Sequence, residues 1–453
     1  TMFKIGIILI PMIWECLRRT TGWSLTIVFS TFFAYVFIGH LMPGMLEGKE
    51  QKFVRAIAEL GVSNVAILGL PTKIIVLTVV LFIWMGQLLL HTGASEWFTD
   101  LAAAIMGRSR GGSAKIAVVA SGLFGSISGS AVSNVASTGV ITIPLMRQAG
   151  YDAKTAGAIE AVASTGGQIM PPIMGAGAFV MAEFTKIPYG EIVWIALVPA
   201  VLYFTSVLLY VHLMAAKAGF KGMQGQPKAW GVFVNGLHFM LPLGLITALL
   251  LWNYSPVLVG VAGTAAVLLA SLLRKHTRIG FKQLVEGLKQ GAMLAISISI
   301  ACAVAGIVVG VIGQTGVGLQ FTESVVSLSG GQLWLALLLV AIAALVLGMG
   351  LPATAAYIVL AVMTGPALQE LGLALITAHM IIFWLSQSSN VTPPIALAAF
   401  AGAGIAGAAP MRSAVEAFKL ANGLFVIPLM MAYSPLLLTS ELGWLPVLGA
   451  AVV

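Results

Sequence analysis

Charged residues are scarce in this chain, and their scarcity indicates the class of protein. They make up 8% of the 453 residues, against 59% hydrophobic residues and a mean hydropathy of +1.02. Because soluble domains carry about 25% charged residues, this composition excludes a soluble protein and indicates a polytopic membrane protein. The net charge of +8 comes from Lys and Arg scattered in short loops between apolar segments. That placement is typical of signals that orient membrane helices, and we expect no nucleic-acid partner.

Cysteine is almost absent as well. Cys16 and Cys302 both lie within apolar segments and form no metal-type spacing, so neither a disulfide framework nor a zinc site is indicated. The apolar segments place no Asp at membrane depth, and no Ser/His pair is fixed by spacing. An intramembrane protease is therefore disfavoured. We expect a protein that is not an enzyme and that needs no cofactor beyond a coupling cation.

Residues 121–177 interrupt the hydrophobic pattern with small polar residues, glycines and prolines. The run GSISGS occupies 125–130, and the run TGGQ at 165–168 precedes the Pro-Pro pair at 171–172. Backbone within a bilayer must satisfy its own hydrogen bonds, so such runs are tolerated only where protein or a water-filled cavity surrounds them. Glycine destabilises a helix interior, and proline has no backbone N–H to donate a helical hydrogen bond. We therefore expect free carbonyls and helix ends directed into a pocket.

A second stretch repeats this pattern 222 residues later. The shift places Gly150 on Gly372, and the Pro-Pro pair at 171–172 on the pair at 393–394. The second copy has its own glycine-rich break at 348–352. Paired interruptions in two halves of a chain predict a transporter with its binding site at the repeat interface.

The apolar segments and their interruptions predict an all-α polytopic fold. We expect two re-entrant hairpins, at 114–149 and 332–370, and two broken helices, at 153–184 and 373–404. The remaining apolar runs predict two apolar helices at 3–17 and 22–41 and a last full helix at 421–439. They also predict crossings at 74–92, 191–215, 231–252, 255–273 and 290–313. The expected domains are two N-terminal helices with an interfacial linker, a first repeat, connecting scaffold helices, a second repeat and the start of a truncated helix: residues 1–60, 61–215, 216–280, 281–440 and 441–453.

The distribution of basic residues indicates how the repeats are oriented. If each hairpin returns to the side from which it entered, seventeen of the 23 Lys and Arg residues fall on one face and six on the other. An asymmetry of this kind marks the cytoplasmic face. The first hairpin then enters from the cytoplasm and the second from outside. The repeats are therefore predicted to be inverted, which favours a secondary transporter over a channel.

Four polar clusters accompany the breaks. The first copy offers Ser126, Ser128, Ser130, Ser133, Asn134, Ser164, Thr165 and Gln168, and the second offers Thr354, Ser386, Gln387, Ser388, Ser389, Asn390 and Thr392. Hydroxyl, amide and carbonyl oxygens bind a hard cation such as sodium without burying full charges. The same small residues also allow close helix packing, and that interpretation stays open for any single serine. The coincidence of all four clusters with helix breaks favours a site, and helix N-termini there favour an anionic substrate.

Three ionisable residues near the breaks are further candidates. Glu160 lies two turns inside the first broken helix, and an ionisable residue at membrane depth is a functional hypothesis by default. We interpret it as a candidate coupling residue for protons, with a structural hydrogen bond to a neighbouring break as the alternative. Arg147 is interpreted as an orientation-setting arginine, with pairing to a substrate carboxylate as the alternative. His379 is interpreted as a packed polar residue.

Two long motifs resemble a known family. The segments GSISGSAVSNVASTGVITIPLMRQAGYD (125–152) and ASTGGQIMPPIMGAGAFVMAEF (163–184) resemble the hairpin and broken-helix signatures of the large membrane subunit of tripartite ATP-independent periplasmic (TRAP) transporters. The resemblance covers roughly residues 60–440. It is strongest to the fused-permease branch that works with TAXI-type binding proteins.

This resemblance implies a function and partners. It implies an elevator-type secondary transporter in a bacterial or archaeal cytoplasmic membrane that imports a small organic acid, driven by sodium, with a proton as the alternative. It also implies a periplasmic TAXI-type substrate-binding protein and small-subunit helices fused in the same polypeptide. Residues 3–41 would be the remainder of those helices, and the chain a fragment of a longer permease. The alternative function is an organic-anion/cation symporter of another elevator family that takes its substrate directly from solution.

The resemblance also implies site residues. Cation ligands are expected at the hairpin tips and the helix breaks: Ser126, Ser128, Ser164, Thr165, Gly166, Gly348, Gly350, Ser386, Ser388, Ser389 and Thr392. The substrate is expected between the tips, against Ser130, Ser133, Asn134, Gln168, Pro352, Thr354 and Asn390.

Overall fold

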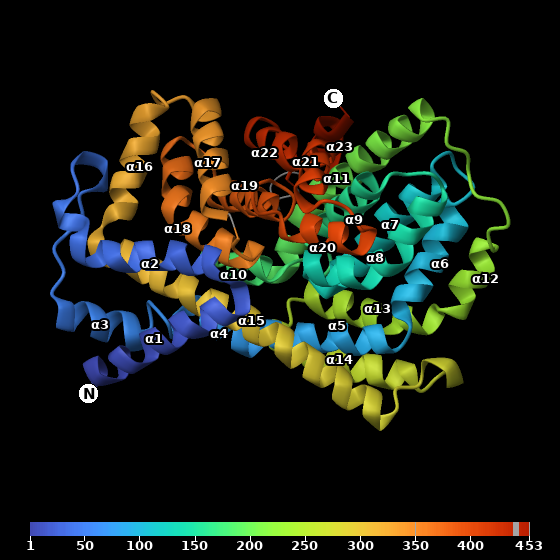
Figure 1. Ribbon diagram of the computed structural model, residues 1–453, viewed down its shortest axis with the longest axis horizontal. Helices are drawn as coiled ribbons and strands as arrows, with labels where there is room; N and C mark the ends of the chain where they lie inside the picture. The colour runs from blue at the N-terminus through green and yellow to red at the C-terminus, as the bar shows by residue number, and fades with distance from the viewer. Residues whose placement is uncertain (349, 438–443, 453) are drawn as a thin grey trace. The chain divides into compact units, whose positions relative to one another are not determined.

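The computed structural model describes residues 1–348, 350–437 and 444–452. Within these residues every regular element is a helix and none is a strand, which confirms the all-α prediction (Figure 1). The chain forms two compact units, each assembled from segments far apart in the sequence. Unit 1 comprises residues 1–77, 179–186 and 294–389, and unit 2 comprises the rest of the chain.

Unit 1 holds the N-terminal helices and most of the second repeat. Its helices are α1 (Met2–Thr21), α2 (Trp23–Ile38), α3 (Phe53–Val62), α4 (Leu70–Ile74), α16 (Val317–Leu328), α17 (Leu333–Gly348), α18 (Ala353–Glu370) and α19 (Leu375–Ser386). Short 3₁₀ turns at Gly39–Leu41 and Gly44–Leu46 connect α2 to α3.

Unit 2 holds most of the first repeat and both ends of the second. Its helices are α5 (Val80–His91), α6 (Ala94–Met106), α7 (Gly112–Ser128), α8 (Ala131–Gln148), α9 (Ala153–Gly167), α11 (Tyr189–Lys217), α12 (Ala229–Asn235), α13 (Leu237–Leu251), α14 (Pro256–Ser271), α20 (Leu397–Ala406), α21 (Pro410–Leu420), α22 (Gly423–Tyr433) and α23 (Trp444–Val452), with a 3₁₀ turn at Lys275–Thr277. Four of the described elements contribute residues to both units: a π-helical turn at Ile75–Val79, α10 (Ala176–Thr185), α15 (Phe281–Thr315) and a 3₁₀ turn at Gln387–Asn390.

Each predicted hairpin range is occupied by a pair of helices. In the first, α7 ends because Gly129 adopts φ 63°, and the Ser130 hydroxyl caps α8 by accepting a hydrogen bond from the Ser133 N–H at 3.4 Å. In the second, Gly350 adopts φ 76° and α18 starts directly after Pro352. Figure 1 shows α17 and α18 side by side, and the two helices are in contact.

The predicted broken helices are interrupted where the glycines and prolines fall. Residues 168–175 separate α9 from α10, and Met174 within them adopts φ 60°. In the second copy α19 tightens into a 3₁₀ turn at Gln387–Asn390, and α20 begins only at Leu397. The Pro-Pro bond is cis in both copies.

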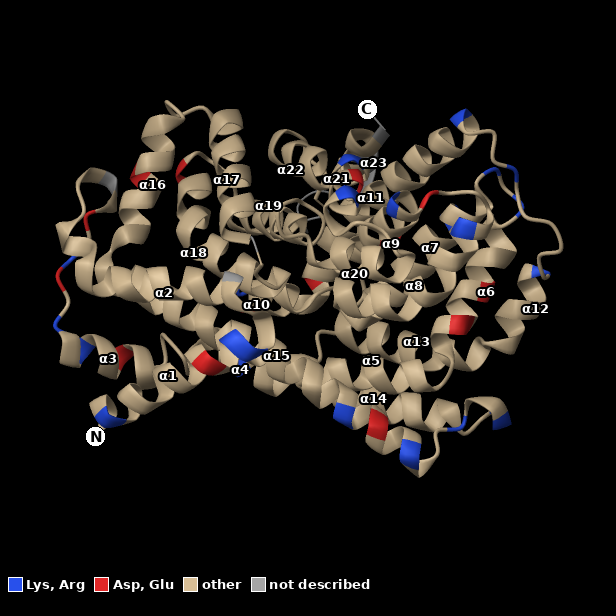
Figure 2. Cartoon of the chain, in the orientation of Figure 1, with Lys and Arg blue, Asp and Glu red and all other residues tan. Residues whose placement is uncertain are grey.

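The predicted crossings are corrected in several places. Among the described residues, four helical spans are long and apolar enough to cross a membrane: Leu70–His91, Tyr189–Lys217, Phe281–Thr315 and Pro410–Tyr433. The two apolar helices predicted at 3–17 and 22–41 are present as α1 and α2. The predicted crossing at 255–273 corresponds to a shorter apolar helix, Pro256–Ser271. The end of the expected 421–439 helix lies outside the described residues, and α22 ends at Tyr433. Figure 2 shows that most charged residues lie at helix ends and in loops.

The crossing expected at 231–252 is a bent pair of helices, which together are long and apolar enough for one broken span. The chain bends by 69° between α12 and α13, at Gly236. The indole of Trp97, from α6, donates a hydrogen bond to the Val232 carbonyl at 2.9 Å. A Cβ at Gly236 would lie 1.9 Å from the Trp97 Nε1 atom, so the ring occupies the space beside that glycine. The bend therefore depends on a contact between residues far apart in the sequence.

Candidate functional site

The first helix break is tied to the tip of the first hairpin. Gln168, the residue after α9, donates from Nε2 to the Gly129 carbonyl at 3.0 Å. The backbone carbonyl of Gln168 accepts a hydrogen bond from the Gly175 N–H at 2.7 Å. The Ser126 carbonyl accepts from the N–H groups of Ile173 and Met174, at 3.2 and 3.3 Å. These bonds satisfy backbone groups that the glycines and prolines leave without helical partners, and they hold the loop against the tip.

Two glycines allow this close approach. A Cβ added at Gly125 would lie 2.7 Å from the Gly167 Cα, and one added at Gly167 would lie 2.5 Å from the Gly125 Cα. The end of α9 therefore packs directly on the backbone of α7. At Gly166, a predicted cation ligand, an added Cβ would lie 2.3 Å from the ring of Tyr203, so α9 also packs closely on α11 there.

A pair of symmetry-equivalent residues meets at the break. The Asn390 Nδ2 donates to the Gln168 Oε1 at 2.8 Å, and both side chains are more than 90% buried. The two residues are 222 positions apart, which is the shift that relates the two copies. Two residues predicted to bind substrate, at equivalent positions of the two copies, are therefore in direct contact.

Glu160 lies about two turns before this break and is fully buried. Its Oε1 accepts from the Ser121 hydroxyl at 2.6 Å and from the Thr138 hydroxyl at 2.5 Å. Its Oε2 accepts from the Thr142 hydroxyl at 2.5 Å, and the Ser164 hydroxyl lies 3.3 Å from Oε1. We call these four hydroxyl residues, from α7, α8 and α9, the hydroxyl cage. Ser164, a predicted cation ligand, is thus a neighbour of the candidate coupling carboxylate.

At the second break, three serine hydroxyl groups donate hydrogen bonds to backbone carbonyls of the preceding helical turn. Ser386 donates to the Phe383 carbonyl at 2.7 Å, Ser388 to Leu385 at 2.6 Å and Ser389 to Ser386 at 2.9 Å. Such bonds to the preceding turn are common for serine and threonine in helices, and each hydroxyl oxygen retains a lone pair for a cation. Thr165 in the first copy behaves in the same way, donating to the Ala161 carbonyl at 2.7 Å.

Three buried oxygen atoms near the breaks have no hydrogen-bond partner among the described residues. They are Ser128 Oγ, Thr392 Oγ1 and Gln387 Oε1. Buried polar atoms are normally paired with protein groups, water or ions, so unpaired oxygens beside a helix break are suited to receive a ligand or an ion. Ser128 and Thr392 were predicted cation ligands.

The structure distributes the predicted site residues between the units. Unit 2 contains Ser126, Ser128, Ser130, Ser133, Asn134, Glu160, Ser164, Thr165, Gly166, Gln168, Asn390 and Thr392, and unit 1 contains Gly348, Gly350, Pro352, Thr354, Ser386, Ser388 and Ser389. Within unit 1, a Cβ at Gly348 would lie 3.2 Å from the Ser389 Cβ, so that tip and that break are adjacent. Asn134 has a structural bond, from Nδ2 to the Ser121 carbonyl at 2.8 Å.

Sequence reasoning missed three members of the hydroxyl cage, Ser121, Thr138 and Thr142. A signal for two of them was present, because Asn134, Thr138 and Thr142 recur at intervals of four and so share one face of α8. A second missed pair lies in unit 1, where the Tyr357 hydroxyl is 2.8 Å from the His379 Nδ1 and both side chains are buried. This contact agrees with the interpretation of His379 as a packed polar residue.

The helix that carries Glu160 begins at a capped end. The Asp152 carboxylate accepts from the Thr155 N–H at 2.9 Å, and Lys154 Nζ lies 3.6 Å from Asp152 Oδ2. Burial raises the pKa of the Asp152 carboxyl, but the hydrogen bonds from Thr155 and the nearby ammonium of Lys154 outweigh it, so the net pKa is lowered. Arg147 donates to the Tyr151 carbonyl at 3.0 Å, which ties it to the same turn.

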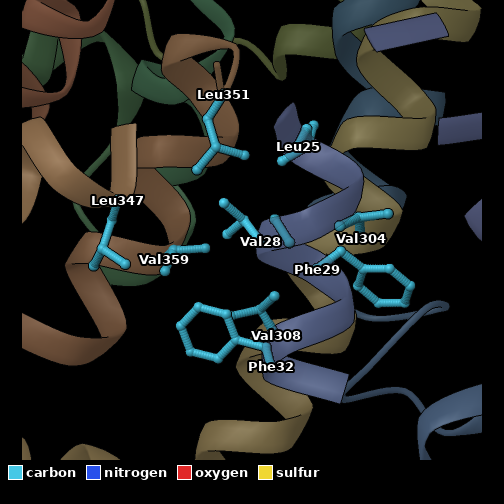
Figure 3. A pocket seen from close by; sticks show the side chains of 10 residues that line it. Leu25, Val28, Phe29, Phe32, Val304, Val308, Leu347, Leu351 and Val359 are labelled. Carbon is cyan, nitrogen blue, oxygen red and sulfur yellow. The ribbon is translucent and has the colours of Figure 1, made fainter. Parts of the chain in front are cut away.

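Two cavities in unit 1 are apolar and offer few groups for a polar ligand. Figure 3 shows one of them, with Leu25, Phe29 and Leu351 among the side chains that line it, all of them apolar. The other has a volume of about 890 Å³ and lies along α2, α16 and α17, with Thr31, Tyr35 and Ser324 as its polar lining residues. The described residues contain no group of three or more His, Cys, Asp or Glu side chains suited to a metal ion.

The sequence matches a protein family over most of its length. The family model described as "Tripartite ATP-independent periplasmic transporter, DctM component" matches residues 8–440. The C4-dicarboxylate TRAP transporter large permease protein DctM of Pseudomonas aeruginosa is 26% identical over 385 residues, which cover 82% of this chain and 86% of that protein. The isethionate TRAP transporter permease protein DctMQ of Oleidesulfovibrio alaskensis is 23% identical over 399 residues, or 84% of this chain and 59% of that protein.

A solved structure shares the fold. The crystal structure of the YdaH transporter of Alcanivorax borkumensis superposes with a TM-score of 0.59 at 15% sequence identity, covering 90% of this chain and 97% of that chain. At this identity the likeness shows the fold alone.

Proposed function

Because the chain belongs to the family of the DctM component of tripartite ATP-independent periplasmic transporters, which are multi-pass membrane transporters and not enzymes, we propose that it imports a small organic acid across the inner membrane by cation-coupled secondary transport. The observation that carries this proposal is the hydrogen bond between Gln168 and Asn390, equivalent residues of the two copies. Binding sites of repeat transporters lie where interrupted helices of the two halves meet, and this pair lies at such a meeting.

The chemistry of the pair suits a carboxylate. Each side-chain amide has two N–H donors. Gln168 uses one on the Gly129 carbonyl, and Asn390 uses one on the Gln168 Oε1. One donor on each residue remains for an anionic ligand. The named substrates of the relatives, C4-dicarboxylates and isethionate, are small organic anions and support this assignment.

The coupling cation is proposed to be sodium, bound beside the breaks. Sodium prefers neutral oxygen ligands, and the unpaired oxygens of Ser128, Thr392 and Gln387 are of this kind. Within unit 2, Ser164 would add a ligand beside Ser128 and Thr392 through a free lone pair. Within unit 1, the serines of the second break would do so beside Gln387. Sodium binding would then order the breaks that hold the substrate.

The partners are proposed from the family. TRAP permeases work with periplasmic substrate-binding proteins and small membrane subunits, and the motifs at 125–152 and 163–184 support a TAXI-type binding protein and a fused small subunit. The movement is proposed to be of the elevator type, with the inverted repeats carrying the substrate across. A symporter that takes its substrate directly from solution is the alternative function.

Transport assays separate these two functions. The protein would be reconstituted in liposomes with its binding protein, and uptake of a panel of radiolabelled carboxylates followed under a sodium gradient or a pH gradient imposed separately. The proposal predicts uptake of one or more carboxylates that requires both the binding protein and the sodium gradient. Uptake that does not respond to the binding protein would establish the alternative, and absence of uptake of every carboxylate under both gradients would contradict both.

A further inference from the structure

Helix α17 of unit 1 has no polar face. Its sequence, LWLALLLVAIAALVLG, is apolar on every side, and Leu338, Ile342 and Val346 are exposed along it. A helix of this kind is surrounded either by other helices or by hydrocarbon. Because the chain belongs to a family of multi-pass membrane proteins, the acyl chains of the bilayer are the medium around unit 1.

The larger of the two apolar cavities described above lies along this helix. We call it the α2–α16 cavity, and its volume of about 890 Å³ is lined by α2, α16, α17 and the connection that follows α2. Leu328, Ile342 and Val346 line it and are 59%, 49% and 53% exposed, so the cavity opens to the surface of unit 1. Sites for small molecules occupy about 300–1,000 Å³ and are mostly apolar. The α2–α16 cavity therefore has the size and lining of a binding site.

Water does not suit this cavity. The hydroxyl groups of Thr31, Tyr35 and Ser324, its polar lining residues, each donate to a backbone carbonyl, at 3.0, 2.9 and 2.6 Å. An ordered water needs about two to four polar partners, and these donors are already used. An empty cavity would deprive the lining atoms of dispersion contacts. The cavity therefore favours an apolar occupant.

The lining side chains favour a flexible chain over a packed helix. Helices associate within membranes through Gly, Ala, Ser and Thr, which allow two backbones to approach closely. Of the 18 described residues that line the cavity, only Thr31, Ser324 and Ala343 are of this kind. Large side chains such as Phe32 and Phe321 hold a second helix backbone away, whereas an acyl chain fits between them.

A charged segment adjoins the cavity. The connection that follows α2 lines the cavity within residues 42–46, and residues 47–52, which we call the charged segment, come directly after it. Figure 2 shows charges of both signs on this connection between α2 and α3. Two acids and two bases of the charged segment are exposed, and none forms an ion pair with another described residue: Glu47, Lys49, Glu50 and Lys52.

Hydrogen bonds hold the charged segment beside the start of α16. The Lys49 N–H donates to the Thr315 carbonyl at 2.9 Å, and the Gln51 Nε2 donates to the Gln314 carbonyl at 2.8 Å. These two carbonyls lie just before α16, which lines the cavity. The free charges are therefore fixed close to the apolar lining.

Tyr35 lies at the boundary between the cavity and the charged segment. Its ring lines the cavity, and its hydroxyl donates to the Leu46 carbonyl at 2.9 Å, one residue before the charged segment. A Cβ added at Gly48 would lie 3.0 Å from the Tyr35 hydroxyl oxygen, so the segment packs against that tip. Tyrosine is enriched where hydrocarbon meets the headgroup region, because its ring is apolar and its tip is polar.

We propose that the α2–α16 cavity binds an acyl chain of a membrane phospholipid with a zwitterionic headgroup, and that the charged segment contacts this headgroup. The phosphate of such a lipid pairs with Lys49 or Lys52, and its ammonium group pairs with Glu47 or Glu50. The bound chain lies against α17 and against Met363 of α18, the two helices of the second hairpin. The site requires only a membrane and does not rest on the proposed function.

Photo-crosslinking in lipid nanodiscs tests the site in the wild-type protein. Two probes carry the same diazirine-bearing acyl chain, one on phosphatidylethanolamine and one on phosphatidylglycerol, which lacks the ammonium group. Each is added at a low mole fraction to nanodiscs made of equal parts of the two lipids, and mass spectrometry of the digested protein locates the crosslinks. We expect crosslinks enriched at the residues that line the cavity, with a higher yield from the phosphatidylethanolamine probe.

A matched pair of substitutions on α17 separates the cavity from the general lipid surface. Ala343 lines the cavity and Ala341 does not, and both are partly exposed. Ala343→Phe is expected to lower crosslinking at the cavity at least about fivefold, because the ring takes the space of the acyl chain. Ala341→Phe is expected to leave it unchanged.

A second pair tests the headgroup contact. The double change Lys49→Gln and Lys52→Gln is expected to lower the yield of the phosphatidylethanolamine probe about twofold to fivefold, since exposed ion pairs contribute modestly. The double change Lys217→Gln and Lys221→Gln, at exposed lysines of unit 2, is the control and should have no effect at the cavity.

Four results would overturn the proposal. The first is crosslinking spread evenly over the exposed apolar surface, with no enrichment at the cavity. The second is an equal loss in Ala343→Phe and Ala341→Phe, and the third is an equal or higher yield from the phosphatidylglycerol probe. The fourth is a copurified polypeptide crosslinked at the cavity in place of lipid. Wild-type crosslinking decides the matter even if Ala343→Phe does not fold, and none of these results depends on substrate uptake.

Discussion

The two copies of the repeat share their backbone plan and differ in their buried chemistry. Helices α7 to α10 of the first copy correspond in order to α17 to α20 of the second. The turn before each broken helix contains a glycine with positive φ, 100° at Gly150 and 94° at Gly372. The interiors diverge, because the first copy buries Glu160 where the second has Ile382. Both copies therefore share the helix breaks, whereas a buried ionisable residue at this position is present in the first copy alone.

The copies also differ in how tightly tip and break approach. Gly125 and Gly167 bring two backbones together in the first copy, whereas Gly348 meets a serine side chain in the second. An added methyl group should therefore destabilise the protein more at Gly125 than at Gly348.

The largest effect is expected from Gly125→Ala compared with Gly348→Ala. The new methyl group in the first copy would lie 2.6 Å from the Asn134 Nδ2 and 2.7 Å from the Gly167 Cα, so tip and break must separate. We expect a loss of about 2 kcal/mol or more in the free energy of unfolding. In Gly348→Ala the nearest atom is 3.2 Å away, and we expect a loss under about 1 kcal/mol. Thermal unfolding in lipid nanodiscs measures both, and equal losses would remove the contrast.

An intermediate effect is expected from Tyr357→Phe, which acts on the polar pair of the second copy alone. The change removes the tyrosine hydroxyl that contacts the buried His379 Nδ1, so about 1–2 kcal/mol of stability should be lost. The matched change in the first copy is Tyr203→Phe, which removes a bond to the Val162 carbonyl and should cost about 1 kcal/mol. Unchanged unfolding of Tyr357→Phe would show that the pair contributes nothing to unit 1.

The smallest effect is expected at the helix starts. Asp152 caps α9, whereas α19 begins after Ala374 with no side-chain cap. Asp152→Ala should cost about 1 kcal/mol near neutral pH. Because the folded-state pKa of Asp152 is lowered, its contribution is full above the unfolded value and is lost as the pH falls through the folded value. Unfolding of the variant and the wild type should therefore converge in acid, and a difference that persists there would contradict the capping role.

The sequence predicted the breaks well because their causes are local. Gly129, Gly350 and the Pro-Pro pairs act on the backbone where they stand, and the helices end beside them. The pair of Gln168 and Asn390 also lay among the predicted site residues, since the duplication aligned them. These features depend on neighbours in the chain or on the repeat.

The features that were missed depend on contacts between distant residues. The bend at Gly236 follows from the ring of Trp97, and the members of the hydroxyl cage approach Glu160 from two other helices. Apolar runs such as 231–252 give no sign of such a bend. A polar residue on a helix face indicates that a partner exists, but only the packing identifies it.

Uptake by variants of the symmetric pair tests the central claim most directly. Gln168→Ala, Asn390→Ala and the double variant would be compared in binding-protein-dependent uptake of the transported carboxylate, with Gln369→Ala on the exposed end of α18 as the control. We expect each single change to lower the uptake rate at least about tenfold, and the double change to lower it by less than the product of the two, because the residues share a hydrogen bond. If all three variants transport at the rate of the control, the site does not lie at the meeting of the two copies.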